Sequence, residues 1–347
     1  MDYDVVIVGA GPAGTSAAYS LRRKGLNVIV IDRLGESQYM RYHSICGAGV
    51  NRKTVSRLDI QDDEILNDIR TLRVTWPQGN SIDMKIDGCI IDRPRMFLRM
   101  RSQCIADGIN FAMGTVRHII MDGGMNSVVL GNGAVIRARY VIGADGAYSI
   151  VRKTVFGTVP EIMMPIEEYH SEAETEDGVM QFIVAERYGG GYQWYFPYGK
   201  GRCTGAIKDY AEDEPGGTRG IRTVPLGWVE HIVKGNVLLV GDAAGMPNPM
   251  TAGGLRTAFE SGMKAAESIV RNDPAKYEKW WKKSKTADRR FMKAHLVFSS
   301  MNDEELSKFS RYMVHKGVWL NGFHSVIHNP RLTWLYLGCL QALRHGW

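Results

Sequence analysis

The chain has 347 residues, a formal net charge of +6 and five cysteines. At this length we expect two closely joined domains, and no apolar run reaches the ~18 residues that a membrane span needs. The cysteines are scattered and lack C-x-x-C spacing, which argues against a disulfide framework or a metal site and for a reducing, cytoplasmic compartment. The thinly spread positive charge argues against a nucleic-acid partner and favours anionic surfaces.

The first 33 residues predict a strand, a glycine turn, a helix and a second strand that ends in an acid. Residues 3–8 are a β-branched run typical of a buried parallel strand, and residues 9–14 match G-x-G-x-x-G. A helical segment follows and stops at Gly25, after which residues 28–31 form another buried strand that ends at Asp32. This context predicts a dinucleotide site rather than a plain glycine turn.

Each part of this motif has a physical task. Gly9 permits the tight turn, Gly11 lets backbone N–H groups approach a pyrophosphate, and Gly14 lets the helix pack closely on the strand. The helix N-terminus offers free donors and a positive dipole end to the phosphates. Asp32 is placed to accept bonds from a pair of ribose hydroxyls.

The next segment combines a cysteine with two glycines. Residues 44–50 read Ser-Ile-Cys-Gly-Ala-Gly-Val; they predict either backbone passing close to a flat ring system or a buried cysteine, Cys46, at a helix start. We expect a helix over residues 54–70. A hairpin follows over residues 72–86, because a Pro-Gln-Gly-Asn turn separates two strand-like runs.

A second helix begins near Pro94 and ends at Gly108. Arg93, just before this helix, either reaches a phosphate or is a solvated arginine. Strands are expected at 110–113 and 115–121, and another hairpin over residues 127–139. Residues 140–146 predict a buried strand that returns to the nucleotide-binding unit and ends in a Gly-Asp-Gly turn at Asp145.

Residues 160–207 predict antiparallel strands, followed by a loop over residues 208–226. Within the strands, Tyr192, Trp194 and Phe196 recur with the period of two that puts side chains on one face. These rings form either core packing or one wall of a large apolar pocket.

A third buried strand, residues 236–240, ends in Gly241-Asp242 and leads through a loop into a helix from Gly253 to about Val270. This is a second helix N-terminus suited to a pyrophosphate or a flavin carbonyl oxygen, and Asp242 suits a ribityl hydroxyl. Residues 273–347 read as helical and rich in Lys, Arg and Trp. The cluster of residues 277–283 predicts either packed tryptophans with an exposed cationic face or contact with an anionic membrane surface.

These motifs together resemble a known class. The glycine turn of residues 9–14, the turn of residues 143–146 and Gly241-Asp242, in that order, resemble the p-hydroxybenzoate hydroxylase class of FAD proteins. Within that class, residues 46–49 and the Tyr-x-Trp-x-Phe-Pro stretch of residues 192–197 resemble the geranylgeranyl reductase family, which hydrogenates double bonds of isoprenoids, including archaeal membrane lipids.

The resemblance implies an α/β (α+β) fold with a Rossmann-type FAD-binding domain, an interleaved antiparallel-sheet substrate domain and a C-terminal helical region. The FAD-binding domain would comprise residues 1–70, 89–158 and 236–272. The substrate domain would comprise residues 71–88 and 159–235, and the helical region residues 273–347. The stretch before Gly241 is shorter than the family pattern, so the resemblance is stronger for the flavin site than for the substrate.

The resemblance also implies the site residues. Cys46 would lie near the isoalloxazine ring, and Tyr192 and Trp194 would line a cavity for the prenyl chain, which makes these three the candidate catalytic residues. The candidate FAD contacts are Gly9, Gly11, Pro12, Ala13, Gly14, Asp32, Arg33, Cys46, Gly47, Gly49, Arg93, the backbone of Val116, Asp145, Gly241, Asp242, Gly253, Gly254 and Leu255.

The leading hypothesis is an FAD-dependent hydrogenation of a prenyl lipid. Reduced FAD would deliver a hydride to one carbon, and an acid (Cys46, Tyr192 or a water that they hold) would protonate the other. An external donor, such as ferredoxin, a reduced deazaflavin or NAD(P)H, would reduce the flavin, and the membrane surface would be a peripheral contact. Two alternatives stay open: a flavin-dependent monooxygenase acting on a small or hydrophobic substrate, and a non-catalytic flavoprotein.

Overall fold

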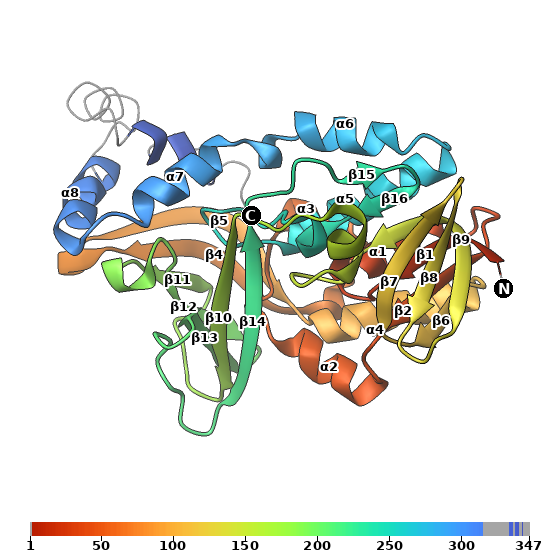
Figure 1. The fold of residues 1–347 in the computed structure, drawn as a ribbon. Coiled ribbons are helices and arrows are strands. Elements are labelled where there is room, and N and C mark those ends of the chain that lie inside the picture. Colours follow the sequence, from red (N-terminus) through yellow and green to blue (C-terminus); the bar gives the residue numbers. More distant parts are fainter. Residues whose placement is uncertain (1, 315–332, 336, 340–341, 343–347) are drawn as a thin grey trace.

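The computed structural model describes residues 2–314, 333–335, 337–339 and 342, and these residues form two eight-stranded sheets with helices packed around them (Figure 1). Sheet A is built on the first predicted strand, whose residues Val5, Val6 and Ile7 have no exposed surface. Its central pairings are parallel, and its order is β15-β16-β9-β1-β2-β6. In addition, β8 pairs with β9, and β7 pairs with β8. Its strands are β1 (Asp2–Val8), β2 (Val28–Asp32), β6 (Asn110–Met113), β7 (Val116–Asp122), β8 (Met125–Leu130), β9 (Val135–Gly143), β15 (Val233–Lys234) and β16 (Val237–Leu239).

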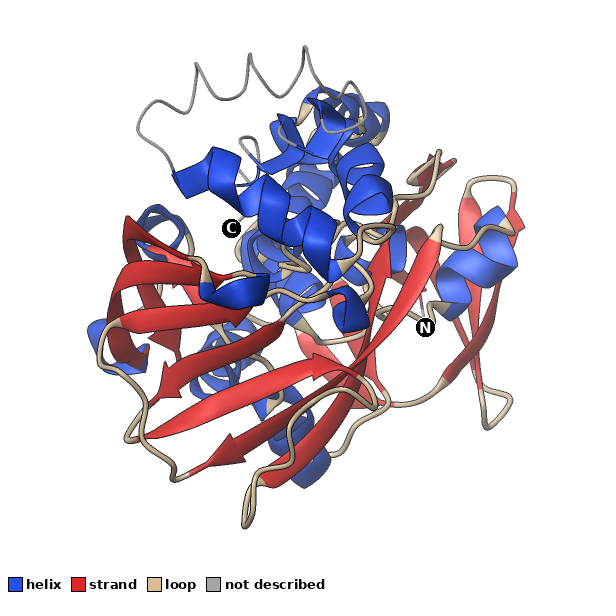
Figure 2. Ribbon diagram, turned by 90° about the vertical axis from the view of Figure 1, so that its left-hand side faces the viewer, coloured by secondary structure: helices blue, strands red, loops and turns tan. Residues whose placement is uncertain are grey.

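Sheet B has the order β14-β10-β13-β12-β11-β4-β5-β3. All of its pairings are antiparallel except that of β4 with β11. Figure 2 looks onto this sheet and shows the helices gathered above and behind its strands. Its strands are β3 (Gly49–Asn51), β4 (Ile65–Thr75), β5 (Ser81–Ile91), β10 (Ile162–Ser171), β11 (Val179–Ile183), β12 (Gln193–Tyr198), β13 (Gly201–Ile207) and β14 (Thr218–Leu226).

Close helix packing fixes the first helix beside sheet A. α1 lies against α4 and α5, and a Cβ at Gly262 of α5 would stand 2.3 Å from the carbonyl oxygen of Ala13 in α1. This approach is possible only with glycine, because any side chain would force the helices apart. The α-helices are α1 (Pro12–Leu21), α2 (Glu36–Ser44), α3 (Arg52–Arg57), α4 (Arg93–Ala106), α5 (Leu255–Val270), α6 (Ala275–Lys283), α7 (Arg290–Phe298) and α8 (Asp303–Val314). Shorter helical turns occur at Asp62–Glu64, Pro77–Gly79, Arg152–Phe156, Glu186–Tyr188, Gly241–Ala244 and Lys285–Ala287.

A separate small core holds the C-terminal helices against sheet B. Trp76, at the end of the β4–β5 hairpin, packs against Phe298 of α7 and Phe309 of α8. In α6, Tyr277 and Trp281 are buried and Trp280 stacks on Tyr277, which agrees with the prediction of packed tryptophans. The rest of the predicted helical region lies outside the described residues. No helix in the described part of the chain is both long and apolar enough to cross a membrane.

Two sequence predictions are wrong. The helix expected over residues 54–70 ends at Arg57, and β4 begins at Ile65, because that segment pairs along its length with β5. The loop expected over residues 208–226 ends in β14, which pairs with β10 from Thr218 to Leu226. In both places long-range pairing overrides the local pattern. The domain boundaries stay a prediction.

Candidate active site

The glycine turn after β1 is shaped by close packing. Gly9 has a φ of +98°, and a Cβ there would lie 2.4 Å from the carbonyl oxygen of Ala144. A Cβ at Gly14 would lie 1.9 Å from the carbonyl oxygen of Gly9. At Gly11, by contrast, an added Cβ would meet only the ring of His43, at 3.6 Å. The outer two glycines therefore hold the turn together, and Gly11 keeps the approach to the start of α1 open.

Asp32 ties the end of β2 to this turn. Its Oδ2 accepts a hydrogen bond of 2.6 Å from the backbone N–H of Ala10, and its Oδ1 accepts one of 2.8 Å from Leu34. Arg33 beside it is exposed. Val116 is the first residue of β7 and follows shortly after the end of β6, the strand that pairs with β2. These residues thus line the carboxyl edge of sheet A, where open parallel sheets bind nucleotides.

Asp242 occupies the carboxyl end of β16, within a cluster of cations. Burial raises the pKa of Asp242 to about 6, against the opposing effect of Arg93, Arg222 and Arg152. The Nε atom of Arg93 and one terminal nitrogen of Arg222 are buried and have no hydrogen-bond partner among the described residues. Buried donors of this kind are costly unless something accepts from them, so they point to an anionic or carbonyl-bearing ligand.

The start of α5 adjoins the same place. A Cβ at Gly254 would lie 3.4 Å from Oδ1 of Asp242, so the helix N-terminus and this carboxylate are neighbours. The adjoining Gly253 is exposed, and Leu255 is the first residue of the helix. Asn248 is buried, and its Nδ2 also has no partner in the described part of the chain. These donors extend the polar lining begun by the arginines.

Other predicted cofactor residues have structural contacts. Pro12 is the first residue of α1, and Ala13 packs against the turn at Gly241, where an added Cβ would lie 3.0 Å from its methyl group. Both carboxylate oxygens of Asp145 accept hydrogen bonds within the following turn, from the Ser149 hydroxyl and the Ile150 N–H, each at 2.6 Å. Asp145 therefore orders residues 149–151, and a direct role in binding stays a prediction.

The loop around Cys46 lies on the aromatic face of sheet B. A Cβ at Gly47 would lie 2.6 Å from the ring of Phe196, and one at Gly49 would lie 3.0 Å from the terminal methyl of Met180. Trp194 and Phe196 share this face because they alternate along β12. Gly47 therefore lets the loop approach the ring of Phe196 closely, and Gly49 does the same at Met180; a flat ring of a cofactor beside this backbone stays a prediction.

The three candidate catalytic residues gather here. Cys46 is half-buried, and its Sγ accepts a hydrogen bond of 3.3 Å from the N–H of Ala48. Tyr192 precedes β12, contacts Trp194 edge-on and donates its hydroxyl to the carbonyl of Thr251. Burial raises the pKa of Tyr192. Trp194 donates its indole N–H to Sγ of Cys203, at 3.4 Å.

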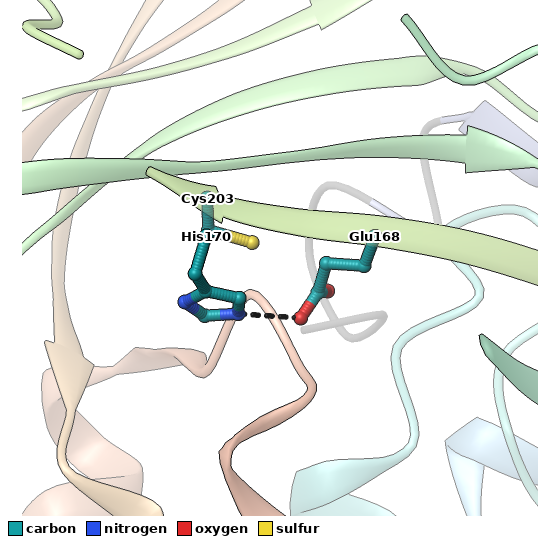
Figure 3. A group of neighbouring side chains, drawn as sticks. All are labelled: Glu168, His170 and Cys203. Atoms are coloured by element: carbon teal, nitrogen blue, oxygen red, sulfur yellow. Dashed lines mark hydrogen bonds and ion pairs between the residues drawn. The ribbon is translucent and has the colours of Figure 1, made fainter. Parts of the chain in front are cut away.

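Sequence reasoning missed a polar group on the same face: Glu168, His170 and Cys203 (Figure 3). Their sequence signal is weak, since only the Glu-x-His spacing along one strand places two of them together. It also missed Arg152 and Arg222, which lie in segments without a motif.

A groove of about 480 Å³, here called the outer groove, lies between α2, α4 and the end of β12 and is lined by Met40, Arg41, Ser44, Leu66, Asp92, Pro94, Tyr198 and Gly199.

The chain is similar to known reductases over most of its length. It is 30% identical to digeranylgeranylglycerophospholipid reductase 2 of Methanopyrus kandleri, covering 88% of this chain and 89% of that protein. It is 28% identical to geranylgeranyl diphosphate reductase of Rhodobacter capsulatus, covering 78% of this chain and 75% of the relative. Residues 4–160 match the family model described as lycopene cyclase protein.

Solved structures share the fold. A geranylgeranyl bacteriochlorophyll reductase-like protein from Thermoplasma acidophilum matches with a TM-score of 0.79 at 20% identity, covering 95% of this chain and 98% of that one. A flavin-dependent brominase matches with a TM-score of 0.68 at 18% identity, covering 100% and 96%. The architecture is therefore that of the flavin-dependent oxidoreductases. Within this class, the chain belongs to the geranylgeranyl reductase family.

Proposed function

We propose that the protein is an FAD-dependent reductase that saturates C=C bonds in the prenyl chains of an isoprenoid lipid. One observation carries the proposal: a single segment, residues 39–49, contacts both the glycine turn at the carboxyl edge of sheet A, through Tyr39 and His43, and the aromatic face of sheet B, through Gly47. A reductase of this kind needs both surfaces, one for the cofactor and one for an apolar chain. The reductase names of the two relatives support this choice of substrate.

The residues present fit FAD. The open approach at Gly11 and the start of α1 suit its pyrophosphate, and Asp32 suits the adenosine ribose. The unpartnered donors of Arg93 and Arg222, together with the start of α5, suit the flavin end. When bound and reduced, FAD supplies a hydride for one carbon of the double bond.

The chain itself must bind the substrate and supply a proton. Trp194 and Phe196 offer a stiff apolar wall to the prenyl chain, which has few polar groups that a protein can recognise. The proton donor we propose is Cys46. Tyr192 is the weaker acid, because its hydroxyl is already donated to Thr251 and burial raises its pKa. An external donor that we expect to be ferredoxin, a reduced deazaflavin or NAD(P)H renews the reduced flavin.

The test is a single turnover without oxygen. The purified protein, loaded with FAD and reduced by dithionite, is mixed with digeranylgeranylglyceryl phosphate in detergent. We expect the flavin absorbance to return as the substrate gains two hydrogens per double bond, measured by mass spectrometry. A protein that leaves this lipid and geranylgeranyl diphosphate unchanged refutes the proposal. Rapid NADPH-driven oxygen consumption that starts on addition of a substrate would establish the monooxygenase alternative instead.

A further inference from the structure

Three polar side chains lie in a row on the face of sheet B that the proposed substrate contacts. His170 of β10 stands directly opposite Cys203 of β13, and Glu168 precedes His170 by two residues, so all three project from the same face. Cys203 in turn stands opposite Phe196, which belongs to the aromatic face of sheet B. Figure 3 shows the imidazole and the thiol both turned toward the Glu168 carboxylate. Here this row is called the polar row.

The members of the polar row lie close to one another. Nε2 of His170 lies 2.7 Å from Oε1 of Glu168, and Sγ of Cys203 lies within 4.8 Å of a carboxylate oxygen of Glu168. These residue types also bind zinc, but two ligands of one tetrahedral zinc ion stand about 3.3 Å apart. The nitrogen and oxygen at 2.7 Å stand closer than that and are hydrogen-bonded to each other.

The middle of the polar row is sealed from solvent. Glu168 stands opposite Gly205 on one neighbouring strand and Gly220 on the other. The missing side chains are replaced by Trp194, whose ring would lie 2.4 Å from a Cβ at Gly205, and by Ile45, 2.4 Å from a Cβ at Gly220. Glu168 is 1% exposed as a result. Such burial of a carboxylate is expensive, and stability alone gives no reason for it.

The two ends of the polar row lead to different places. The His170 side chain is 18% exposed, and its ring packs edge-on against Tyr198, which lines the outer groove. Cys203 at the other end is fully buried and accepts the indole N–H of Trp194. That indole nitrogen would lie 3.8 Å from a Cβ at Gly47, the residue after Cys46. The row thus joins a solvent-facing imidazole to the loop that carries the proposed proton donor.

We propose that His170, Glu168 and Cys203 form a proton relay that resupplies Cys46 from solvent. This inference rests on the proposed function. Each saturated double bond takes a hydride from the reduced flavin and the proton of the Cys46 thiol. The Cys46 thiolate then takes the proton of the Cys203 thiol. His170 takes a proton from water and transfers one to the Glu168 carboxylate, which passes it to the Cys203 thiolate. Every relay group ends unchanged, and solvent loses one proton per double bond.

The test uses Glu168→Gln, which keeps the shape of the side chain and removes the acid. Its matched control is Glu167→Gln, because Glu167 lies on the opposite face of β10 and pairs there with Arg219 and Tyr169. We expect repeated turnover of geranylgeranyl substrate to fall about 100-fold in Glu168→Gln and to stay near the wild-type rate in Glu167→Gln. Equal rates in Glu168→Gln and the wild type overturn the relay but leave the proposed function standing.

His170→Ala provides a readout that a structural role would not give. Because His170 reaches solvent, free imidazole should replace it and restore most of the lost rate in this variant, but none of it in Glu168→Gln. Failure of imidazole to rescue a slowed His170→Ala variant counts against the relay. A wild-type protein that reduces no prenyl substrate refutes the proposed function, and the role of the relay with it.

A measurement without turnover tests the connection itself. The infrared S–H band of Cys203, identified by its loss in Cys203→Ala, should move to higher frequency in Glu168→Gln, because the amide is a weaker acceptor than the carboxylate. It should not move in Glu167→Gln. An unshifted band in Glu168→Gln, or one bound zinc per chain by elemental analysis, overturns the relay.

Discussion

Replacing Asp32 by Asn tests where the cofactor lies. The Asp32 carboxylate accepts two backbone hydrogen bonds, from Ala10 in the glycine turn and from Leu34 after β2. In the proposed complex it also accepts the ribose hydroxyls of FAD. Asn keeps one acceptor oxygen, loses the other and removes the negative charge. The substitution therefore loosens the turn and weakens the ribose contact at once, while the aromatic face of sheet B is untouched.

The magnitude follows from these contacts. A hydrogen bond to a charged group contributes about 1.5–3 kcal/mol, and Asp32 is only half-buried, so the lower part of that range applies. Losing one bond to the turn and weakening one to the ribose then costs about 2–3 kcal/mol of FAD binding. Since 1.4 kcal/mol is a factor of ten, the dissociation constant should rise about 30- to 150-fold.

The assay is a fluorescence titration of deflavinated protein with FAD. Asp4→Asn is the matched control, because Asp4 lies at the opposite end of β1 and accepts one backbone bond from Asn27. Its dissociation constant should stay within a factor of three of the wild type. At saturating FAD, Asp32→Asn should reduce its substrate at the wild-type rate. If Asp32→Asn binds FAD normally and changes the choice of substrate, the proposed orientation of FAD, with its adenosine ribose at Asp32, is wrong.

Three further changes give separate expectations. Gly14→Ala puts a Cβ 1.9 Å from the Gly9 carbonyl and should lower the melting temperature of the apoprotein by ~5 °C or more, whereas Gly11→Ala should leave it unchanged and weaken FAD binding; calorimetry and titration distinguish them. Cys46→Ala should slow single-turnover flavin reoxidation about 100-fold, and Tyr192→Phe less than about threefold; the reverse order would make Tyr192 the donor. Because the pKa of Asp242 is raised to about 6, the folded apoprotein keeps a proton that the unfolded chain releases, and its stability should fall by at most about 3 kcal/mol as pH rises from 4 to 7. Asp242→Asn should lose that fall and be the more stable apoprotein at pH 7, as denaturant titrations at the two pH values would measure.

The nucleotide-binding half could be predicted because its signals are local. A β-branched run, glycines at fixed spacing and an acid at the end of the next strand each constrain the backbone within a few residues. The structure places Gly9 and Gly14 at close approaches and Asp32 beside the turn, as the pattern indicates. Asp242 was predicted in the same way, because it comes at the end of a buried strand and before a helix.

The polar row could not be predicted, because it depends on register between strands far apart in the sequence. Glu168 and Cys203 are 35 positions apart and meet only because His170 pairs with Cys203. β14 was mistaken for a loop, since an edge strand with glycine and polar residues lacks the alternation of a half-buried strand. Its Gly220 matters only in the folded sheet, where it makes room for Ile45 over Glu168.

The two sheets divide the proposed reaction between them. A hydride and a proton must reach opposite ends of one double bond, and the groups that supply them would neutralise each other in direct contact. In this fold the proposed cofactor edge belongs to sheet A and the polar row to sheet B, and the segment of residues 39–49 contacts both sheets. Trp194 covers Glu168 and donates a hydrogen bond to Cys203, so the middle of the polar row is closed to solvent and His170 is its exposed end. Substitutions on sheet A should therefore change cofactor binding, and those in the polar row should change the rate of proton supply.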